Sequence, residues 1–526
     1  MDRIDDRHGR ANRRAYPAAP LTATTAGAQR LAALVAACLA AALASCAVGP
    51  DFRRPPAPTA ERTLPPGASD EVPAPAELAP RFGAASDVPA DWWTRFQCQP
   101  LDALVRDAVD RSPNLRAATA ALRASEDSLR AGYGVFLPQV GVAATAARQD
   151  TVTVVDRALV ARGPSRLGTL TASVSYAPDL FGGQRRAVEQ LGAKVDAQRY
   201  AYLAAWLALT TNVANTAIAR SGYQAQREAL ADVIRMQQEQ IRIAEVQFEA
   251  GTSSYAPVAA LRSQRATNSA TLATLDQRID QSEHLLAQLE ARAPADARLP
   301  AIRLDELVVP LDVPDSLPSA LARRRPDILA AEASLHVASA QIGIATADLF
   351  PTLALSGSGG TAHGAIADLL RAGTRYWSLQ ASLAASVFNG GSTWYTRRAA
   401  IDAYDEALAV YEQTVLGALQ QVADAMRALQ HDAQVQDAQR EAQVAADENL
   451  KLARANFEAG NAGYLDLLTA DGQVQQARLG VAGAVAQRLQ DTVALYAALG
   501  GGWWNGNPAG AGVMPADAVR DAREGR

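Results

Sequence analysis

The chain has 526 residues, of which 49% are hydrophobic, 20% charged and only 6% aromatic, and its mean hydropathy is −0.08. The longest apolar stretch, residues 31–44, is shorter than the roughly 20 residues that a spanning helix needs, so a polytopic helical membrane protein is excluded. The 50 basic and 55 acidic residues give a net charge of −5, which excludes the clustered basic footprint of a nucleic-acid-binding protein.

The N-terminus has the pattern of a secretory signal, with arginines before the apolar stretch and small residues after it. The stretch ends in Leu-Ala-Ser before Cys46, which resembles the bacterial lipobox. Residues 1–45 are therefore predicted to be a lipoprotein signal peptide, and Cys46 the lipidated N-terminus of the mature chain. An ordinary signal peptide that contains a cysteine is the alternative. Ala47 follows where an aspartate would favour retention in the inner membrane, so the resemblance implies sorting to the outer membrane.

Two segments are predicted to lack regular structure. Ten of the 27 prolines lie between residues 50 and 89, so residues 46–90 should form an extended, lipid-anchored tether. Residues 504–526 are rich in Gly, Ala and charge and should form a flexible tail. After cleavage only Cys46 and Cys98 remain, and one of them would be acylated, so no disulfide framework is expected and Cys98 is predicted to be packed.

The body of the chain repeats once. Pro113 and Pro138 each have a counterpart 213 residues later, at Pro326 and Pro351, and both sit in similar local sequence. The run Phe-Glu-Ala-Gly that ends at Gly251 recurs letter for letter 209 residues later. Landmarks in the same order at nearly constant offset indicate duplication. We expect a first repeat at residues 91–292, an extended, proline-rich connection at 293–318, and a second repeat at 319–503.

Each repeat is predicted to hold the same elements. A helix is expected over residues 101–131, and Pro138 ends helical character. Alternation with period two predicts two strands in each repeat, at residues 138–145, 169–176, 351–358 and 377–387. Proline-free runs predict two long helices, each followed by a return helix, at residues 184–250, 257–292, 392–459 and 464–499. The strand–helix junctions are expected at Pro138, Gly182, Gly183, Pro351, Gly390 and Gly391.

The strands fit a transmembrane β-barrel, with apolar side chains outward and small polar ones inward. A half-buried sheet in a soluble domain is the alternative. Four strands cannot close a barrel, and an open edge in lipid leaves backbone groups unsatisfied, so a barrel must be shared between chains. Two copies would supply eight strands and three would supply twelve. The long helices, roughly 100 Å each at the helical rise, must stand in water and are predicted to form a conduit.

The chain resembles the TolC-like outer-membrane efflux proteins, in their NodT-type lipoprotein branch. The resemblance rests on six motifs: Cys-Ala-Val-Gly-Pro-Asp-Phe from Cys46, the pair Trp92-Trp93, Arg-Pro-Asp-Ile from Arg325, Phe350-Pro351, Phe-Asn-Gly-Gly ending at Gly391, and the run at residues 494–503. It implies a mostly α fold with a small transmembrane β part, in a homotrimer with a twelve-stranded β-barrel and a twelve-helix periplasmic tunnel. It also implies a periplasmic adaptor, an inner-membrane pump of the resistance-nodulation-division class, and a location in the outer membrane among its lipids.

The resemblance also implies a gate at the periplasmic tips of the helix pairs, where acidic residues form a ring. Asp466 fits the first acidic position of the family's tip motif, whereas Thr469 replaces the second and Ala462 stands where some relatives carry an arginine. Three copies of Asp466 would repel one another and attract cations unless protonated or screened. The alternative for Asp466 is a solvated aspartate stabilised by the dipole of its helix. The tip turns, with adaptor contact as one role and packing as the other, are assigned to Gly251, Tyr255, Gly460 and Tyr464.

An enzyme is the main competing class, and the sequence does not favour it. The five histidines are scattered without metal-ligand spacing, and the Gly-rich run at residues 357–362 follows a single strand without a βαβ unit. We therefore expect no catalytic residue, metal or cofactor. Among conduits, the exit duct of a tripartite pump for small molecules such as drugs is favoured, and a conduit for type I protein secretion is the alternative.

Overall fold

The computed structural model describes residues 47–56, 75, 77–83, 87–155, 158–314, 320, 323–364 and 375–506. The predicted signal peptide, Cys46 and most of the predicted tail lie outside these residues. The chain divides into two compact units. In the described residues, the strand unit comprises 47–48, 139–183 and 350–386, and the helical unit comprises 49–138, 184–349 and 387–506.

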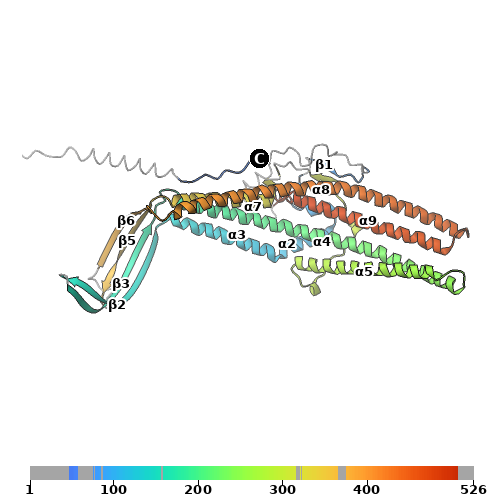
Figure 1. Cartoon of the computed structure of the whole chain (residues 1–526), viewed down its shortest axis with the longest axis horizontal. Coiled ribbons are helices and arrows are strands. Elements are labelled where there is room, and N and C mark those ends of the chain that lie inside the picture. Colours follow the sequence, from blue (N-terminus) through green and yellow to red (C-terminus); the bar gives the residue numbers. More distant parts are fainter. Residues whose placement is uncertain are drawn as a thin grey trace, which may run out of the picture. The chain divides into compact units, whose positions relative to one another are not determined.

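The strand unit is one antiparallel sheet to which each repeat contributes two strands (Figure 1). Its strands are β2 (Gln139–Val155), β3 (Ala158–Tyr176), β5 (Thr352–His363) and β6 (Arg375–Ala384), in the order β2-β3-β5-β6. All four predicted strands are present, but β2 continues ten residues past its predicted end at 145 and β3 begins eleven residues before its predicted start at 169, because the two strands pair with each other along that extra length. The last was predicted to run to residue 387, but β6 ends at Ala384 because its partner β5 begins at Thr352, which pairs with Ala384, and the ladder stops there.

The register of this sheet separates two kinds of side chain, because directly paired residues lie on the same face. Val140 pairs with Val174, and Val174 leads through Gly357 to Leu379. The adjacent row, Gly141, Ser173, Ser358 and Ser378, carries small and hydroxyl side chains on the opposite face. On the apolar face Trp377 and Leu379 are each 82% exposed. Within the chain, this face therefore leaves large apolar side chains uncovered.

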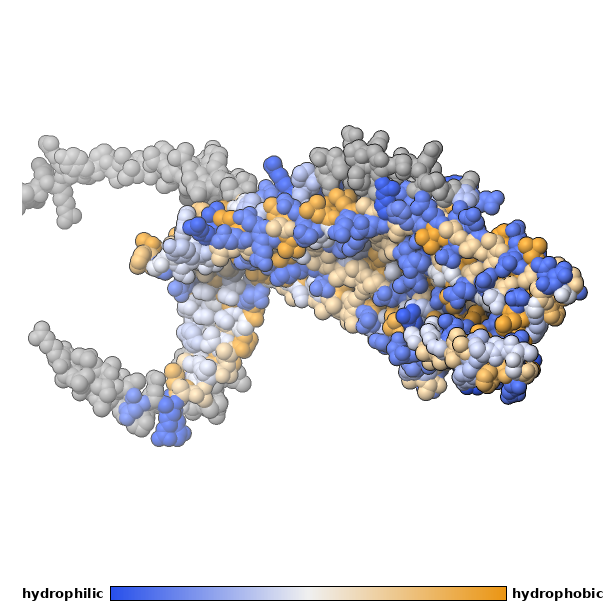
Figure 2. Space-filling model, turned by 45° about the vertical axis from the view of Figure 1, so that its right-hand side comes forward, coloured by the Kyte–Doolittle hydropathy of each residue, from blue (hydrophilic) through white to orange (hydrophobic). Residues whose placement is uncertain are grey.

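The helical unit contains two long hairpins (Figure 1). The first consists of α4 (Gly183–Glu249) and α5 (Ala256–Leu289), and the second of α8 (Ser392–Glu458) and α9 (Tyr464–Ala498). These bounds lie within three residues of those predicted from the proline-free runs. The hairpins also contact one another, since Leu230 and Val233 of α4 pack with Leu275 of α5 and Leu479 of α9. Hydrophilic side chains spread over much of their visible surface (Figure 2).

The predicted helix at 101–131 is wrong in one respect, because it is two helices, α2 (Gln99–Arg111) and α3 (Pro113–Gly132). Pro113 has no N–H to donate to the preceding turn and suits the first position of a new helix. The Ser112 side chain caps that helix by accepting a bond from the Leu115 N–H at 3.3 Å. A short 3-10 turn, η2 (Tyr133–Phe136), follows before β2.

The counterpart in the second repeat is a single helix, α7 (Pro326–Ala347). It is the one described helix long and apolar enough to cross a membrane, but 56% of its most apolar window is buried inside the structure. Ile328 packs against Tyr411, Val415 and Ala418 of α8, and Ile342 and Ala345 pack against Ala400 of the same helix. Packing as a core helix therefore explains its apolar composition.

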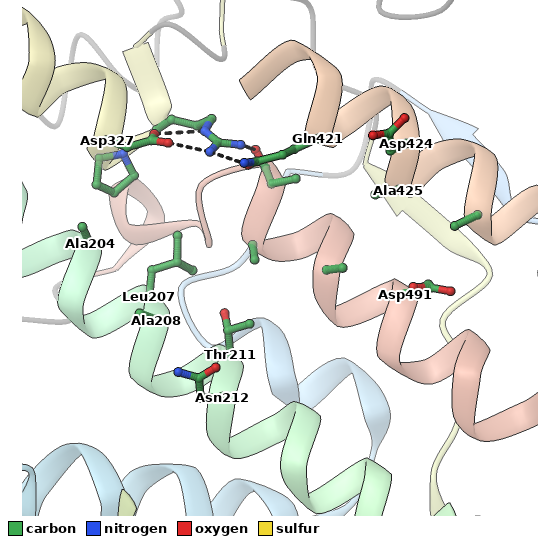
Figure 3. Close-up of a pocket in the computed structure, with 16 residues that line it drawn as sticks. Ala204, Leu207, Ala208, Thr211, Asn212, Asp327, Gln421, Asp424, Ala425 and Asp491 are labelled. Atoms are coloured by element: carbon green, nitrogen blue, oxygen red, sulfur yellow. Dashed lines mark hydrogen bonds and ion pairs between the residues drawn. The ribbon is translucent and has the colours of Figure 1, made fainter. Parts of the chain in front are cut away.

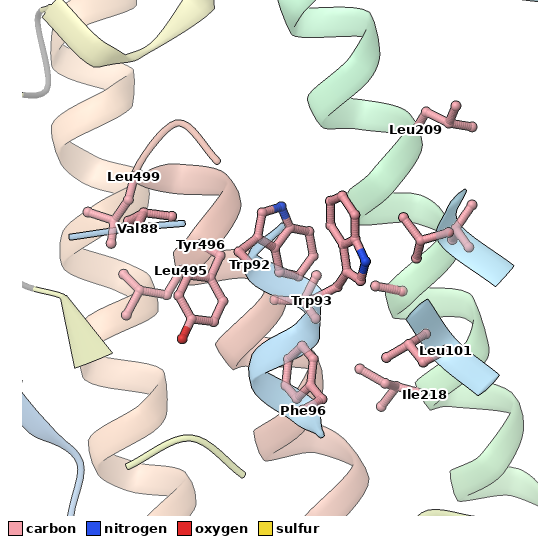
Figure 4. Close-up of a cluster of buried hydrophobic side chains, with 14 of the residues drawn as sticks. Val88, Trp92, Trp93, Phe96, Leu101, Leu209, Ile218, Leu495, Tyr496 and Leu499 are labelled. Carbon is pink, nitrogen blue, oxygen red and sulfur yellow. The ribbon is translucent and has the colours of Figure 1, made fainter. Parts of the chain in front are cut away.

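The main hydrophobic core is built on the Trp-Trp motif (Figure 4). The 3-10 turn η1 (Trp92–Phe96) places Trp92 against Tyr496 of α9, with ring centroids 5.5 Å apart, and Trp93 near Trp206 of α4. Cys98 is also buried in this core, as predicted, and burial raises the pKa of its thiol.

Short elements surround this core. A two-stranded parallel sheet joins β1 (Arg81–Gly83) to β4 (Asp312–Pro314), so the prediction that residues 46–90 lack regular structure is wrong at β1, where backbone pairing orders the chain. The connection between the repeats also contains the 3-10 turns η3 (Pro294–Asp296) and η4 (Leu304–Glu306). The turn η6 (Trp503–Asn505) follows α9 and buries Trp504 in the core, so the prediction that the flexible tail begins at residue 504 is wrong. Trp503 Nε1 donates to the Arg324 carbonyl at 2.7 Å, so the end of the second repeat is bound to the start of that repeat's first helix.

Candidate functional site

Both hairpin tips use the same turn. Gly251 and Gly460 have φ values of 72° and 75°, the left-handed region that only glycine enters without strain. The Thr252 N–H donates to the Gln247 carbonyl at 3.0 Å, and at the other tip the Asn461 N–H donates to the Asn456 carbonyl at 2.8 Å. These are the six-to-one bonds of a Schellman motif, which satisfies carbonyls at a helix end. The repeated Phe-Glu-Ala-Gly sequence thus forms two equivalent helix stops.

An aromatic pair crosses each turn. Phe248 lies 5.3 Å from Tyr255 and Phe457 lies 5.6 Å from Tyr464, measured between ring centroids. Tyr255 is 47% exposed and Tyr464 is 41% exposed. Each tyrosine therefore packs inside its own tip and also presents part of its ring to solvent. The two predicted roles, packing and contact with a partner, are compatible in this geometry.

Asp466 is exposed in the first turn of α9 and caps that helix. Its Oδ2 accepts a hydrogen bond from the Gly463 N–H at 3.0 Å. The Thr469 hydroxyl donates to the Leu465 carbonyl at 2.8 Å within the same helix, and Ala462 is half-buried in the turn. This geometry is compatible with the alternative predicted for Asp466, a solvated aspartate stabilised by the dipole of its helix, and leaves an exposed carboxylate at the tip.

The two tips differ in their polar side chains. At the first tip, Arg262 of α5 donates from Nη1 to the Tyr255 hydroxyl at 3.1 Å and from Nη2 to Glu245 Oε1 of α4 at 2.5 Å. The bond to Glu245 is the main cause that raises the pKa of Arg262. The turn at this tip has Pro257 where α9 has its first-turn residues, and supplies no carboxylate equivalent to Asp466. The tips are therefore matched in backbone but not in charge.

The predicted strand–helix junctions lie where the chain passes between strands and helices. Pro138 and Pro351 immediately precede β2 and β5. Gly390 and Gly391 have positive φ values of 66° and 85°, and Gly391 is the N-cap of α8. Gly183 is the first residue of α4.

Gly182, at φ 83°, contacts the start of the described chain. A Cβ on Gly182 would lie 2.6 Å from Ala47 Cα, and the Val48 N–H donates to the Phe181 carbonyl at 3.0 Å. The residue after Cys46 therefore packs on a junction in the strand unit, and the junction glycine leaves room for it.

The next residues dock on the helical unit, which sequence reasoning did not foresee. Asp51 Oδ1 accepts from Arg186 Nη2 at 2.7 Å, and Arg186 Nη1 donates to Glu189 Oε2 at 2.7 Å. Burial opposes the charge of Arg186, but these two bonds prevail and raise its pKa. The Phe52 ring stacks on His336 of α7, with centroids 4.2 Å apart. The motif that starts at Cys46 contains Asp51 and Phe52, so the sequence drew attention to these two residues. It gave no indication of Arg186 and His336, the residues that they contact.

A second unforeseen group lies between α8 and α9. Asp432 Oδ2 is buried without a hydrogen-bond donor in the described chain, and the Asp432 carboxyl faces that of Asp491. Burial, and then the neighbouring Asp491, raise the pKa of Asp432 to about 7. The buried Arg488 donates to Gln436 Oε1 at 2.7 Å and to the Leu78 carbonyl, and burial lowers its pKa. In the described residues no group of three or more His, Cys, Asp or Glu side chains is placed to hold a metal.

The sequence profile described as "Outer membrane efflux protein" matches residues 104–291 and 317–501, one segment in each repeat. The outer membrane protein OprJ of Pseudomonas aeruginosa is 30% identical over 472 residues, which cover 89% of this chain and 95% of OprJ. Nodulation protein T of Rhizobium leguminosarum bv. viciae is 28% identical over 481 residues, which cover 89% of this chain and 93% of that protein. The solved structure of the outer-membrane channel OprN is 27% identical, with a TM-score of 0.75, over 87% of this chain and 100% of OprN.

Proposed function

Because the chain belongs to the outer membrane efflux protein family, whose members are efflux channels of the outer membrane, we propose that it is the exit duct of a tripartite pump. Its partners would be a periplasmic adaptor and an inner-membrane pump of the resistance-nodulation-division class, and its cargo small molecules such as drugs. The duct itself performs no chemical reaction, since the pump supplies the work.

The observation that carries the proposal is the sheet of the strand unit. In the described chain its outer strands, β2 and β6, each pair with one strand only, so both edges are open. Open edges and uncovered apolar side chains are costly for a chain alone, but a closed barrel in lipid satisfies both. Three chains with four strands each would close a barrel of twelve strands, wide enough for a pore. We propose a homotrimer on this ground.

The lipid anchor at Cys46 is supported by the packing of the residues that follow it. Ala47 and Val48 pack on the junction at Gly182, and Asp51 and Phe52 dock on α4 and α7. Four of the first six described residues are thus held against the rest of the chain. An acylated Cys46 would hold the duct in the outer membrane, with the helical tunnel in the periplasm.

The tips are proposed as the gated entrance and as the surface that the adaptor contacts. In a trimer, three exposed Asp466 carboxylates would line the entrance, where they would narrow it and hold cations. Tyr255 and Tyr464 would offer their exposed ring edges to the adaptor, close to the turns at Gly251 and Gly460. Aromatic side chains with one packed face and one exposed face are common in such contacts.

The test is conductance of the purified full chain in planar bilayers. We expect a trimer that conducts poorly until opened, and a higher basal conductance for Asp466→Ala. Asp466→Asn separates two effects, because its amide oxygen still accepts the Gly463 bond and only the charge is lost. It should lower selectivity for cations with little change in stability. A monomer in the soluble periplasmic fraction would refute the duct, and unchanged conductance in both variants would remove Asp466 from the gate.

A further inference from the structure

A cavity of about 640 Å³ lies in the helical unit, away from the hairpin tips (Figure 3). Its walls come from α4, α8 and α9 and from the first residues of α7. Seven of its sixteen lining residues are alanines, and Leu207 adds a larger apolar side chain. The cavity exists because small side chains face one another across three helices. Its volume lies in the range of pockets that hold small organic molecules.

The one basic side chain in the lining is held by four hydrogen bonds. Arg325 donates to both carboxylate oxygens of Asp327, at 3.0 and 2.6 Å, and also to Gln421 Oε1 at 2.8 Å and to the Ala498 carbonyl at 2.9 Å. Figure 3 shows the contacts of this network that reach Asp327 and Gln421. Arg325 and Asp327 thus neutralise each other, and four of the five N–H groups of Arg325 donate to groups of the protein.

Two other carboxylates in the lining have no such partner. Asp424 of α8 accepts from the Gln420 amide at 3.3 Å, and Asp491 of α9 accepts from the Gln487 amide at 2.9 Å. In the described part of the chain no arginine, lysine or histidine nitrogen lies within 4.0 Å of either one. Asp491 also faces Asp432, which lies outside the lining, next to Arg488, and whose raised pKa keeps it largely protonated below pH 7, so the negative charge of the cavity comes from Asp424 and Asp491. The polar part of the cavity therefore carries uncompensated negative charge.

We propose that this alanine-walled cavity binds a small organic cation with an apolar body, such as an aromatic ammonium compound. The apolar body would replace water against the alanines and Leu207, and the cationic group would lie between Asp424 and Asp491. A metal ion is a poor match, because two carboxylates on different helices do not form a compact ligand set. That such a cation is cargo in transit rests on the proposed duct function, whereas the binding itself does not.

The probe is ethidium, titrated by fluorescence anisotropy against the full chain purified as a trimer in detergent. Asp424→Asn should weaken binding about fivefold to tenfold, because one partly exposed charge contact is lost. Asp491→Asn should weaken binding by the same factor, although it also removes the repulsion between Asp491 and Asp432. The matched control is Asp405→Asn, an exposed aspartate of α8 outside the cavity, which should leave the affinity unchanged. Higher salt should weaken binding to the wild type more than to the Asn variants.

Ala494→Phe provides an independent arm, because Ala494 is an exposed residue of the wall and a phenyl ring there would occupy space that the apolar body of the ligand needs. Ethidium binding should be lost although both carboxylates remain. The proposal is overturned if ethidium does not bind to a conducting trimer, if fluorescein binds equally well, or if the Asn and Phe variants keep the wild-type affinity. A trimer that binds ethidium as expected but never conducts would refute the duct and leave the site standing.

Discussion

Asp432→Asn is expected to stabilise the chain at alkaline pH and to leave its stability unchanged in acid. Asp432 faces the carboxyl of Asp491 and the guanidinium of Arg488, both on α9. Burial and the neighbouring carboxyl hold its pKa at about 7, above its ordinary value of 3.8. An asparagine has nearly the same shape as the protonated carboxyl and cannot ionise, so it keeps the favourable state at every pH.

The sign follows from proton linkage. Between pH 4 and 7 the folded chain retains a proton on Asp432 that the unfolded chain has released, so the stability of the wild type falls as the pH rises through this interval. The full shift of about three pH units corresponds to about 4 kcal/mol at 1.36 kcal/mol per unit. Since Asp432 is half-buried, solvent screening reduces the expected effect to about 1–2 kcal/mol.

The assay is chemical unfolding of the full chain in detergent, followed by circular dichroism at pH 4.5 and pH 8. The free energy of unfolding of Asp432→Asn should equal that of the wild type at pH 4.5 and exceed it by about 1–2 kcal/mol at pH 8. Asp491→Asn should act in the same direction, and the double variant should gain less than the sum, because either change removes the same repulsion. The exposed Asp405→Asn should show no such pH dependence.

A loss of stability for Asp432→Asn at pH 8 would refute this reasoning. It would mean that an ionised Asp432 stabilises the fold through attraction to Arg488, and that this attraction outweighs burial and the repulsion from Asp491.

Two further predictions concern the backbone of the tips and the junction of α7, α8 and α9. Gly460→Ala should destabilise the second tip by about 1 kcal/mol, because φ is 75° there and alanine is strained in that region. Gly472→Ala, in the interior of α9 with open space around its Cα, should stabilise the chain by a similar amount. Equal effects of the two changes on the free energy of unfolding would contradict the turn assignment. Arg325→Lys should lower the free energy of unfolding by about 2 kcal/mol or more, because lysine cannot make the paired hydrogen bonds that the buried guanidinium donates to Asp327. The control is Arg303→Lys, at an exposed arginine–aspartate pair with the same spacing, which should lower it by less than about 0.5 kcal/mol. Similar losses at both arginines would argue that burial of Arg325 adds nothing.

Much of the fold could be predicted because helices and strands follow from the local periodicity of apolar residues. Proline-free runs located both long helices, and period-two alternation located all four strands and assigned their faces. The letter-for-letter repeat that ends at Gly251 and Gly460 located both tips, since a left-handed turn needs a glycine at one position. The break at Ser112 was missed, because apolar spacing continues across it and only the missing N–H of Pro113 interrupts the helix.

Other features were decided by tertiary structure, because they join residues that are far apart in the chain. Arg186 meets Asp51 across 135 residues, and nothing in either local sequence indicates the other. Asp432 and Asp491 are ordinary polar positions on two helices until packing brings their carboxyls together.

The sequence by itself therefore determined which segments are helices and strands and where they turn, since backbone geometry and burial of one face act over a few residues. Tertiary structure alone decided which charges face one another, which arginine is neutralised, and where alanines from three helices leave a cavity. Charge pairing and packing depend on distances in space, and those distances are set only when the two repeats fold against each other.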